Sequence, residues 1–223
     1  MKRFHRRCRR LCILAALLVL LVLFLRQNVL LDTASRHAIL LDAQSGQVLA
    51  QKRADERTAP ASLTKLVSGS EDNFAALMNQ KAAELGMKNT HFTNATGLTD
   101  TEHYSSAADM AMLLQAALHN ATFRTIFTAE HYTTTATAQH PEGVSLTSTL
   151  LGKLDGTELP EGAQIEGGKT GYTAAAGLCL ASLATVNEKE YILVTLAAPG
   201  DHGTEQYNIR DAVHVYRKLA DKK

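Results

Sequence analysis

Residues 165–197, with the sequence IEGGKTGYTAAAGLCLASLATVNEKEYILVTLA, decide the fold. Three runs rich in strand-forming residues, Ile165 to Tyr172, Gly177 to Thr185 and Tyr191 to Ala197, follow one another across short turns, which predicts antiparallel neighbours. The first run contains Gly167-Gly168-Lys169-Thr170-Gly171. Glycines on a strand let a ligand approach the backbone, and a cation and a hydroxyl beside a strand edge suit a substrate with a free carboxylate.

The rest of the chain adds strands at the front of the body and helices in its middle. His37 to Asp42 and Gln47 to Gln51 are expected to form a hairpin around a glycine-containing turn. Helices are predicted from Glu71 to Leu85, from near Ser106, and from about Gln206 to Leu219. No helix or strand is assigned between residues 120 and 162. This order predicts an α+β domain with an antiparallel sheet flanked by helices.

Charge is distributed unevenly along the 223 residues. The chain has 23 basic and 22 acidic residues, but seven of the basic ones precede the first acidic residue, Asp32. From residue 27 onward, the chain therefore has 16 basic and 22 acidic residues, a net charge of −6. An acidic body with no Trp and 5% aromatic residues lacks the basic face and stacking platforms of nucleic-acid-binding proteins. No nucleic-acid partner is expected.

Residues 1–31 are interpreted as a targeting segment. The uncharged, almost wholly apolar run from Leu11 to Leu25 follows six basic residues, as in a secretory signal. As a helix it spans about 22 Å, short of the roughly 30 Å hydrocarbon core. No clean small-x-small cleavage site follows, and Thr33-Ala34-Ser35 is the nearest. We slightly favour an uncleaved signal anchor in the membrane over a cleaved signal peptide. Both interpretations predict that the rest of the chain is exported.

Ser62-Leu63-Thr64-Lys65 is a candidate nucleophile motif. On a helix, Ser62 and Lys65 lie on one face, where the amine can take the proton of the hydroxyl if its pKa is lowered. An S-x-x-K pattern is expected about once by chance in a chain of this length, so the motif is weak alone. The Lys-Thr-Gly triplet has only a chance of about 5% and is more informative.

Cysteines and histidines indicate neither a disulfide framework nor a metal site. Cys8 and Cys12 lie in the targeting segment, and Cys179 is expected to be a buried apolar side chain. The histidines show no metal-ligand spacing. No metal and no cofactor is expected.

The order of these motifs resembles that of the penicillin-recognising serine enzymes, and most of all the low-molecular-mass D-alanyl-D-alanine carboxypeptidases. Five stretches carry the resemblance: Pro60 to Lys65, Phe74 to Met87, Thr93 to Leu98, His103 to Ala107, and Gly168 to Thr173. The resemblance extends from about His37 to Leu219. It implies a β-lactamase/transpeptidase-like fold and one penicillin-binding peptidase-like domain over residues 32–223.

The resemblance also implies a reaction. Ser62 would attack the carbonyl between two D-alanines of a peptidoglycan stem peptide, with Lys65 as its base, to form an acyl-enzyme. The backbone N–H groups of Ser62 and Tyr172 would form the oxyanion hole. Lys169 and Thr170 would hold the terminal carboxylate, and the strand with Gly171 and Tyr172 would bind the peptide by β-augmentation. β-Lactams would be covalent inhibitors, and the protein would lie in the bacterial cell envelope.

One feature of the family is missing. The family carries a third motif, Ser-x-Asn, on a helical segment well after S-x-x-K, but here Val67 runs directly into Ser68-Gly69-Ser70-Glu71. The helical region is therefore expected to be truncated, with Ser70 as a helix N-cap. Two alternatives stay open: a catalytically impaired member that binds peptidoglycan or another partner, and a β-lactamase, for which no deacylating carboxylate is identified.

Overall fold

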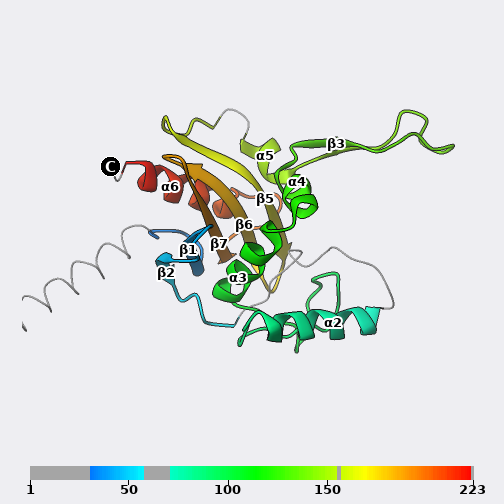
Figure 1. Cartoon of the computed structure of the whole chain (residues 1–223), viewed down its shortest axis with the longest axis horizontal. Coiled ribbons are helices and arrows are strands. Elements are labelled where there is room, and N and C mark those ends of the chain that lie inside the picture. Colours follow the sequence, from blue (N-terminus) through cyan, green and yellow to red (C-terminus); the bar gives the residue numbers. More distant parts are fainter. Residues whose placement is uncertain (1–30, 58–70, 155–156, 222–223) are drawn as a thin grey trace, which may run out of the picture.

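The computed structural model describes residues 31–57, 71–154 and 157–221, the side chains of residues 71–73 excepted. Its centre is a five-stranded sheet with the strand order β2-β1-β7-β6-β5, in which all neighbours are antiparallel (Figure 1). The strands are β1 (His37–Asp42), β2 (Val48–Lys52), β5 (Ala163–Thr173), β6 (Gly177–Val186) and β7 (Lys189–Ala198). The antiparallel runs and the N-terminal hairpin expected from the sequence are confirmed.

Strand β1 joins the N-terminal hairpin to the C-terminal strands. It pairs with β7 from His37 opposite Leu196 to Asp42 opposite Tyr191. Strands β6 and β7 therefore lie inside the sheet, whereas β5 forms one of its edges. The chain must therefore bring together segments about 150 residues apart to complete its sheet.

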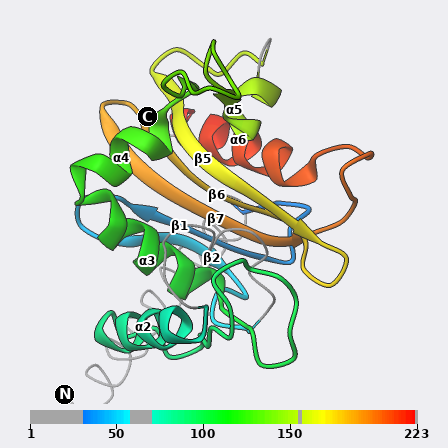
Figure 2. The same ribbon diagram turned by 90° about the vertical axis from the view of Figure 1, so that its right-hand side faces the viewer.

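Both faces of the sheet are covered by helices. Figure 2 shows α3 (Ala107–Leu118) and α4 (Ala121–Thr128) on one side and α5 (Thr149–Leu154) and α6 (Tyr207–Ala220) on the other. Successive side chains of β6 point to opposite faces of the sheet, as in any pleated strand. Leu180 belongs to the apolar cluster under α6, whereas Cys179 and Leu183 belong to the cluster under α3.

Ser182, Tyr216 and Cys179 are buried polar or ionisable side chains of this core. The Tyr216 hydroxyl on α6 lies 3.0 Å from Ser182 Oγ of β6, which satisfies both buried groups. Cys179 is a free, fully buried cysteine, as expected, and burial raises the pKa of its thiol to about 11. Cys179 is therefore a neutral packing group at physiological pH.

Helix α2 (Glu71–Glu84) packs on α3 through a small, separate apolar cluster, to which the loop that follows α2 also contributes. Its buried members are Ala82, Met87 and Phe92. The predicted helix 71–85 is confirmed, and the chain leaves it at Gly86 with φ of 77°, a conformation that glycine adopts readily. Ser70, the expected N-cap, lies outside the described residues.

The helix predicted from near Ser106 is confirmed as α3, with Ser106 as its N-cap. Ser106 Oγ accepts a hydrogen bond from Asp109 N at 3.1 Å at the start of α3. In a capping box, the Asp109 carboxylate would accept a hydrogen bond from the backbone N–H of Ser106. Here it accepts from Asn89 N and Thr90 Oγ1 instead. Asp109 therefore ties α3 to the loop after α2.

The region between residues 120 and 162, to which no element was assigned, contains two short helices and a hairpin. They are α4, the strands β3 (His131–Thr133) and β4 (Ser145–Thr147), and α5. The helices have eight and six residues, shorter than the window of about 11 residues over which a helical period is judged. Both hairpin strands have three residues, too few for an alternation to be recognised in the sequence, and both are exposed throughout; the hairpin projects from the body (Figure 1).

Membrane-spanning helices were sought only in the described ranges, 31–57, 71–154 and 157–221. None of the helices there is long and apolar enough to cross a bilayer. The expected targeting run, Leu11 to Leu25, lies outside these ranges.

We predict that acidification destabilises the fold through His103. Its side chain is 3% exposed, its Nδ1 accepts a hydrogen bond from Thr93 N, and burial lowers its pKa, although nearby Asp100 acts in the opposite direction. The unfolded chain therefore binds the proton more readily, so stability is lost as pH falls through about 6.5 and below. The drop in Tm between about pH 7.5 and pH 5.5 should be smaller in His103→Gln than in the wild type.

The matched control is His131→Gln, which changes an exposed histidine on the hairpin. It should keep the full wild-type drop in Tm. An equal drop in the wild type and in His103→Gln would contradict the role of His103.

Candidate active site

The candidate substrate-binding residues lie on an edge strand. Lys169, Thr170 and Gly171 of β5 pair with Ala181, Leu180 and Cys179 of β6, respectively. No other strand of the described residues pairs with the opposite edge of β5. An edge of this kind offers unpaired backbone groups to an extended peptide.

Two glycines let helices approach β5 closely on both sides. A Cβ on Gly167 would lie 2.3 Å from the carbonyl oxygen of Phe127 in α4, and one on Gly168 would lie 2.4 Å from a methyl group of Leu150 in α5. A side chain at Gly167 would collide with the backbone of α4, and one at Gly168 would displace the Leu150 side chain of α5 and crowd the Ala181 carbonyl oxygen of β6 at 2.7 Å. The glycines therefore clamp the start of the Lys-Thr-Gly segment between α4 and α5.

Lys169 lines an apolar cavity of about 400 Å³ on the α3 side of the sheet. The walls come from three helices, with Phe74 and Leu77 of α2, Leu113 of α3 and Phe127 of α4 among the lining residues. The Lys169 ammonium also donates a hydrogen bond to the Thr170 carbonyl. A cation at an apolar cavity beside an open strand edge can hold a carboxylate whose neighbouring groups are apolar.

Tyr172 contacts the loop between β7 and α6. Its ring meets that of His202 edge-on, with the ring centroids 4.8 Å apart. The loop is held by its own hydrogen bonds, among them Asp201 N to Thr204 Oγ1 at 2.7 Å. This loop therefore supports the end of the Lys-Thr-Gly strand.

A second loop reaches the end of β5 from the helical side. Asn94 Oδ1 accepts hydrogen bonds from Thr96 N at 3.1 Å and from Gly97 N at 2.8 Å, which closes a tight turn. Thr99 Oγ1 then donates to Thr173 Oγ1 at 3.1 Å. The Thr93 to Leu98 stretch, one of the five that carry the family resemblance, thus lies beside the candidate site.

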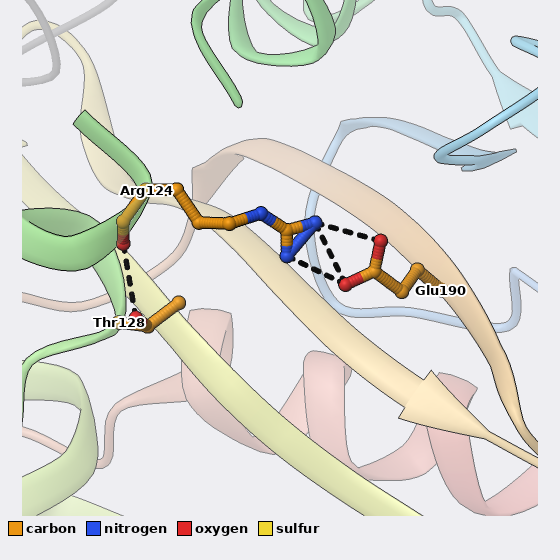
Figure 3. Close-up of polar contacts among 3 residues, drawn as sticks. All are labelled: Arg124, Thr128 and Glu190. Carbon is orange, nitrogen blue, oxygen red and sulfur yellow. Dashed lines mark hydrogen bonds and ion pairs between the residues drawn. The ribbon is translucent and has the colours of Figure 1, made fainter. Parts of the chain in front are cut away.

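An ion pair fixes α4 over the sheet. Arg124 of α4 and Glu190 of β7 form a bidentate pair, with Nη1–Oε1 at 2.6 Å and Nη2–Oε2 at 2.7 Å (Figure 3). The Thr128 hydroxyl donates to the Arg124 carbonyl at 2.9 Å, within the same helix (Figure 3). Bidentate geometry holds the helix at a defined angle, and α4 carries the Phe127 carbonyl that faces Gly167.

The proposed nucleophile and base, Ser62 and Lys65, lie outside the described residues. The chain before them ends at Arg57, whose guanidinium stacks 4.5 Å from the centroid of the Tyr104 ring. The chain after them resumes with α2, which lines the cavity. The structure therefore brings together Lys169, the cavity and the two supporting loops, and the roles of Ser62 and Lys65 remain predictions from sequence.

Residues 31–57, 71–154 and 157–221 contain no cluster of three His, Cys, Asp or Glu side chains that could hold a metal ion.

Several residues around the site were not found from the sequence. Arg124, Phe127, Thr99 and His202 are 30 to 70 residues from Lys169 and belong to no motif. One available signal was Asn120, whose side chain caps α4 by accepting from Phe123 N at 3.0 Å. An Asn followed by apolar residues at helical spacing indicates a helix start, but nothing in the sequence says where that helix packs.

The chain belongs to the D-alanyl-D-alanine carboxypeptidase family. The family model matches residues 25–68 and 66–200, which is well over half of the chain. The match comes in two pieces that meet at residues 66–68, the point at which the sequence indicates a missing helical segment.

Curated relatives carry the same description. D-alanyl-D-alanine carboxypeptidase DacF of Bacillus subtilis is 37% identical over 141 residues, which cover 63% of this chain and 34% of the relative. DacC of Escherichia coli is 33% identical over 140 residues, which cover 62% of this chain and 32% of the relative. The chain thus spans about a third of the length of these relatives.

Solved structures show the fold. A mutant of the Streptomyces K15 DD-transpeptidase superposes with a TM-score of 0.71 at 21% identity, covering 84% of this chain and 99% of that one. A D-alanyl-D-alanine carboxypeptidase from Mycobacterium tuberculosis gives a TM-score of 0.68 at 21% identity, covering 85% and 92%. The expected β-lactamase/transpeptidase-like fold is confirmed.

We predict that Gly167→Ala destabilises the site. The added Cβ would meet the Phe127 carbonyl at 2.3 Å and Thr128 Cα at 2.8 Å, and both are backbone atoms that must move. Overpacking of this kind costs roughly 1–3 kcal/mol, which thermal unfolding would detect as a lower Tm. Gly152→Ala in α5, whose nearest contact would be at 3.5 Å, is the matched control and should not lower Tm. Equal Tm values for the two variants would refute the clamp.

We predict that Arg124 and Glu190 are energetically coupled. Their side chains are 38% and 24% exposed, so solvent screens the pair only in part. A double-mutant cycle of Arg124→Ala and Glu190→Ala should give a coupling of about 1 kcal/mol that decreases at high salt. The exposed pair Arg210 and Glu205 should give almost none. Additive single-variant effects at Arg124 and Glu190 would show that the pair does not hold α4.

Proposed function

We propose that this protein is an exported serine-type D-alanyl-D-alanine carboxypeptidase that removes the terminal D-alanine from peptidoglycan stem peptides. The observation that carries the proposal is the placement of Lys169-Thr170-Gly171-Tyr172 on an open edge strand, with Lys169 in the wall of the apolar cavity. Membership of the carboxypeptidase family supports the same reaction.

The proposed reaction assigns a role to each candidate residue. The stem peptide pairs with the free edge of β5, and the Lys169 ammonium and Thr170 hydroxyl hold its terminal carboxylate. Ser62 Oγ attacks the carbonyl between the two D-alanines while Lys65 takes its proton, and backbone N–H groups of Ser62 and Tyr172 stabilise the oxyanion. D-Alanine leaves with a proton, and water then hydrolyses the acyl-enzyme. β-Lactams would acylate the same serine.

The proposed location is the bacterial cell envelope. Six basic residues followed by the apolar run from Leu11 to Leu25 support export of an acidic body with the N-terminus left in the cytoplasm. The Listeria monocytogenes penicillin-binding protein D2, solved in an ampicillin-bound form, has the same fold at a TM-score of 0.66 and 21% identity.

One observation favours a second candidate, a binding protein without turnover. The family match breaks at residues 66–68, and no Ser-x-Asn motif follows in the sequence. Without that motif, the edge strand and Lys169 could still bind a peptide while deacylation or proton transfer fails.

We predict that the purified full chain is acylated by a fluorescent penicillin at Ser62. Ser62→Ala should abolish the labelling, as seen by gel fluorescence and peptide mass spectrometry. Lys169→Ala should slow it roughly 10- to 100-fold, because a charge-assisted hydrogen bond to the carboxylate is lost. Lys153→Ala, which removes an exposed lysine bonded to Gln206 on the α6 side, is the matched control and should label normally.

A different result would select the second candidate. If the folded wild type is not labelled and a D-Ala-D-Ala peptide binds equally well to wild type and Ser62→Ala, the protein is a binding member of the family. Loss of both labelling and peptide binding in a folded protein would exclude both candidates.

A further inference from the structure

The segment directly after the expected targeting region is part of the folded core. Leu31 is 4% exposed and belongs to the apolar cluster under α6, together with Val215 and Tyr216. Thr33 is 8% exposed, and its carbonyl accepts a hydrogen bond from Lys52 Nζ of β2 at 2.7 Å. Residues that ordinarily link a removable signal to a body are here packed against it.

A buried carboxylate on α6 holds this segment. Asp211 is 4% exposed; its Oδ1 accepts from Ala34 N at 2.7 Å, and its Oδ2 accepts from Ser35 N at 2.7 Å and from Ser35 Oγ. No ion pair found between described residues includes Asp211. Each hydrogen bond that the structure shows to this carboxylate is donated by Ala34 or Ser35.

Cleavage at the nearest small-residue site would remove these donors. A cut after Ser35 in Thr33-Ala34-Ser35 deletes both backbone N–H donors and the hydroxyl, and it deletes Leu31 from the core. A buried carboxylate without partners is strongly unfavourable, so the cut chain would lose much of its stability. A cut after Ala34 would place Asp32 at the third position before the bond, where a signal needs a small residue.

We propose that the exported chain keeps its apolar N-terminal segment as a membrane anchor, and that Asp211 of α6 fastens that anchor to the body. This inference rests on the proposed export of the protein. Five residues, 26–30, separate the apolar run from Leu31, so even a fully extended link spans at most about 18 Å. The body therefore sits against the membrane surface.

The attachment point has a consequence for the candidate site. Leu31 packs in the cluster on the α6 face of the sheet, whereas Lys169 lines the cavity on the α3 side. The anchor thus joins the body on the opposite face from the cavity. A large cell-wall polymer can then approach β5 without passing the point at which the chain meets the membrane.

The first experiment determines the N-terminus and the location of the full chain. The protein with a C-terminal tag is produced in a bacterial host, purified from membranes in detergent, and analysed by intact mass and peptide mapping. Residues 31–35 should still be joined to the apolar segment, and protease added to spheroplasts should digest the body.

The outcomes separate the anchor from the export on which it rests. A body that protease reaches but that begins at Ser35 or Arg36 would overturn the anchor and leave export standing. An intact chain whose body the protease cannot reach would overturn export, and with it both the anchor and the proposed location.

The second experiment tests the fastening by Asp211. In full-length protein in detergent, Asp211→Asn should lower Tm by roughly 5 °C or more, because one acceptor becomes a donor that faces an N–H group. Asp221→Asn, at the exposed C-terminal end of α6, is the matched control and should change Tm by less than about 1 °C.

A milder variant covers the case in which Asp211→Asn does not fold. Ser35→Ala removes only the hydroxyl donor, since its backbone N–H still reaches Asp211 Oδ2. It should lower Tm by a few degrees. An unchanged Tm in Ser35→Ala together with an unchanged Tm in Asp211→Asn would refute the fastening.

Discussion

The rest of the structure depends on the burial of β6 and β7 on both faces. In an antiparallel sheet one face is often solvated, but nine of the twelve largest fully buried side chains of the described residues lie on β1, β6 or β7, among them Leu180, Leu183, Leu193 and Val194. Such strands are stable only if helices cover both sides. The two helical layers are therefore required by the sheet, and all other elements are arranged around this sandwich.

The candidate site lies where this sandwich ends. Strand β5 has helices on both faces, and no strand within residues 31–57, 71–154 and 157–221 pairs beyond it, so its backbone edge is the place at which a peptide can join the sheet. The close approach of α4 and α5 at Gly167 and Gly168 holds the strand rigid just before Lys169. Arg124 and Glu190 then fix α4 itself. A rigid edge reduces the ordering cost of binding an extended peptide.

The proposed anchor and the candidate site lie on opposite faces of the same sheet. Asp211 receives the incoming chain on α6, while α2, α3 and α4 form the cavity on the other side. Strand β1 links the two, because it begins two residues after Ser35 and pairs with β7 in the centre of the sheet. The order of the chain thus places the proposed membrane attachment and the candidate substrate site on opposite faces of the sheet.

Long, periodic segments were predictable because their local pattern decides their structure. The strands β5 to β7, the helix α2 with its end at Gly86, and the contiguous Lys169 to Tyr172 motif were all found from the sequence. The exposed hairpin of β3 and β4 was not, because each of its strands has three residues, too few for a pattern to stand out. The short helix α4 was missed for lack of length, and with it Arg124 and Phe127.

The sequence by itself determined the α+β class, the family and the chemical motifs, since these depend on residue order and periodicity. Only the tertiary structure decided which distant residues meet: Arg124 with Glu190, Thr99 with Thr173, Tyr172 with His202, and Ser35 with Asp211. The physical reason is that such contacts depend on how helices and loops pack over the sheet. Packing is set by the whole core, and no local run of residues encodes it.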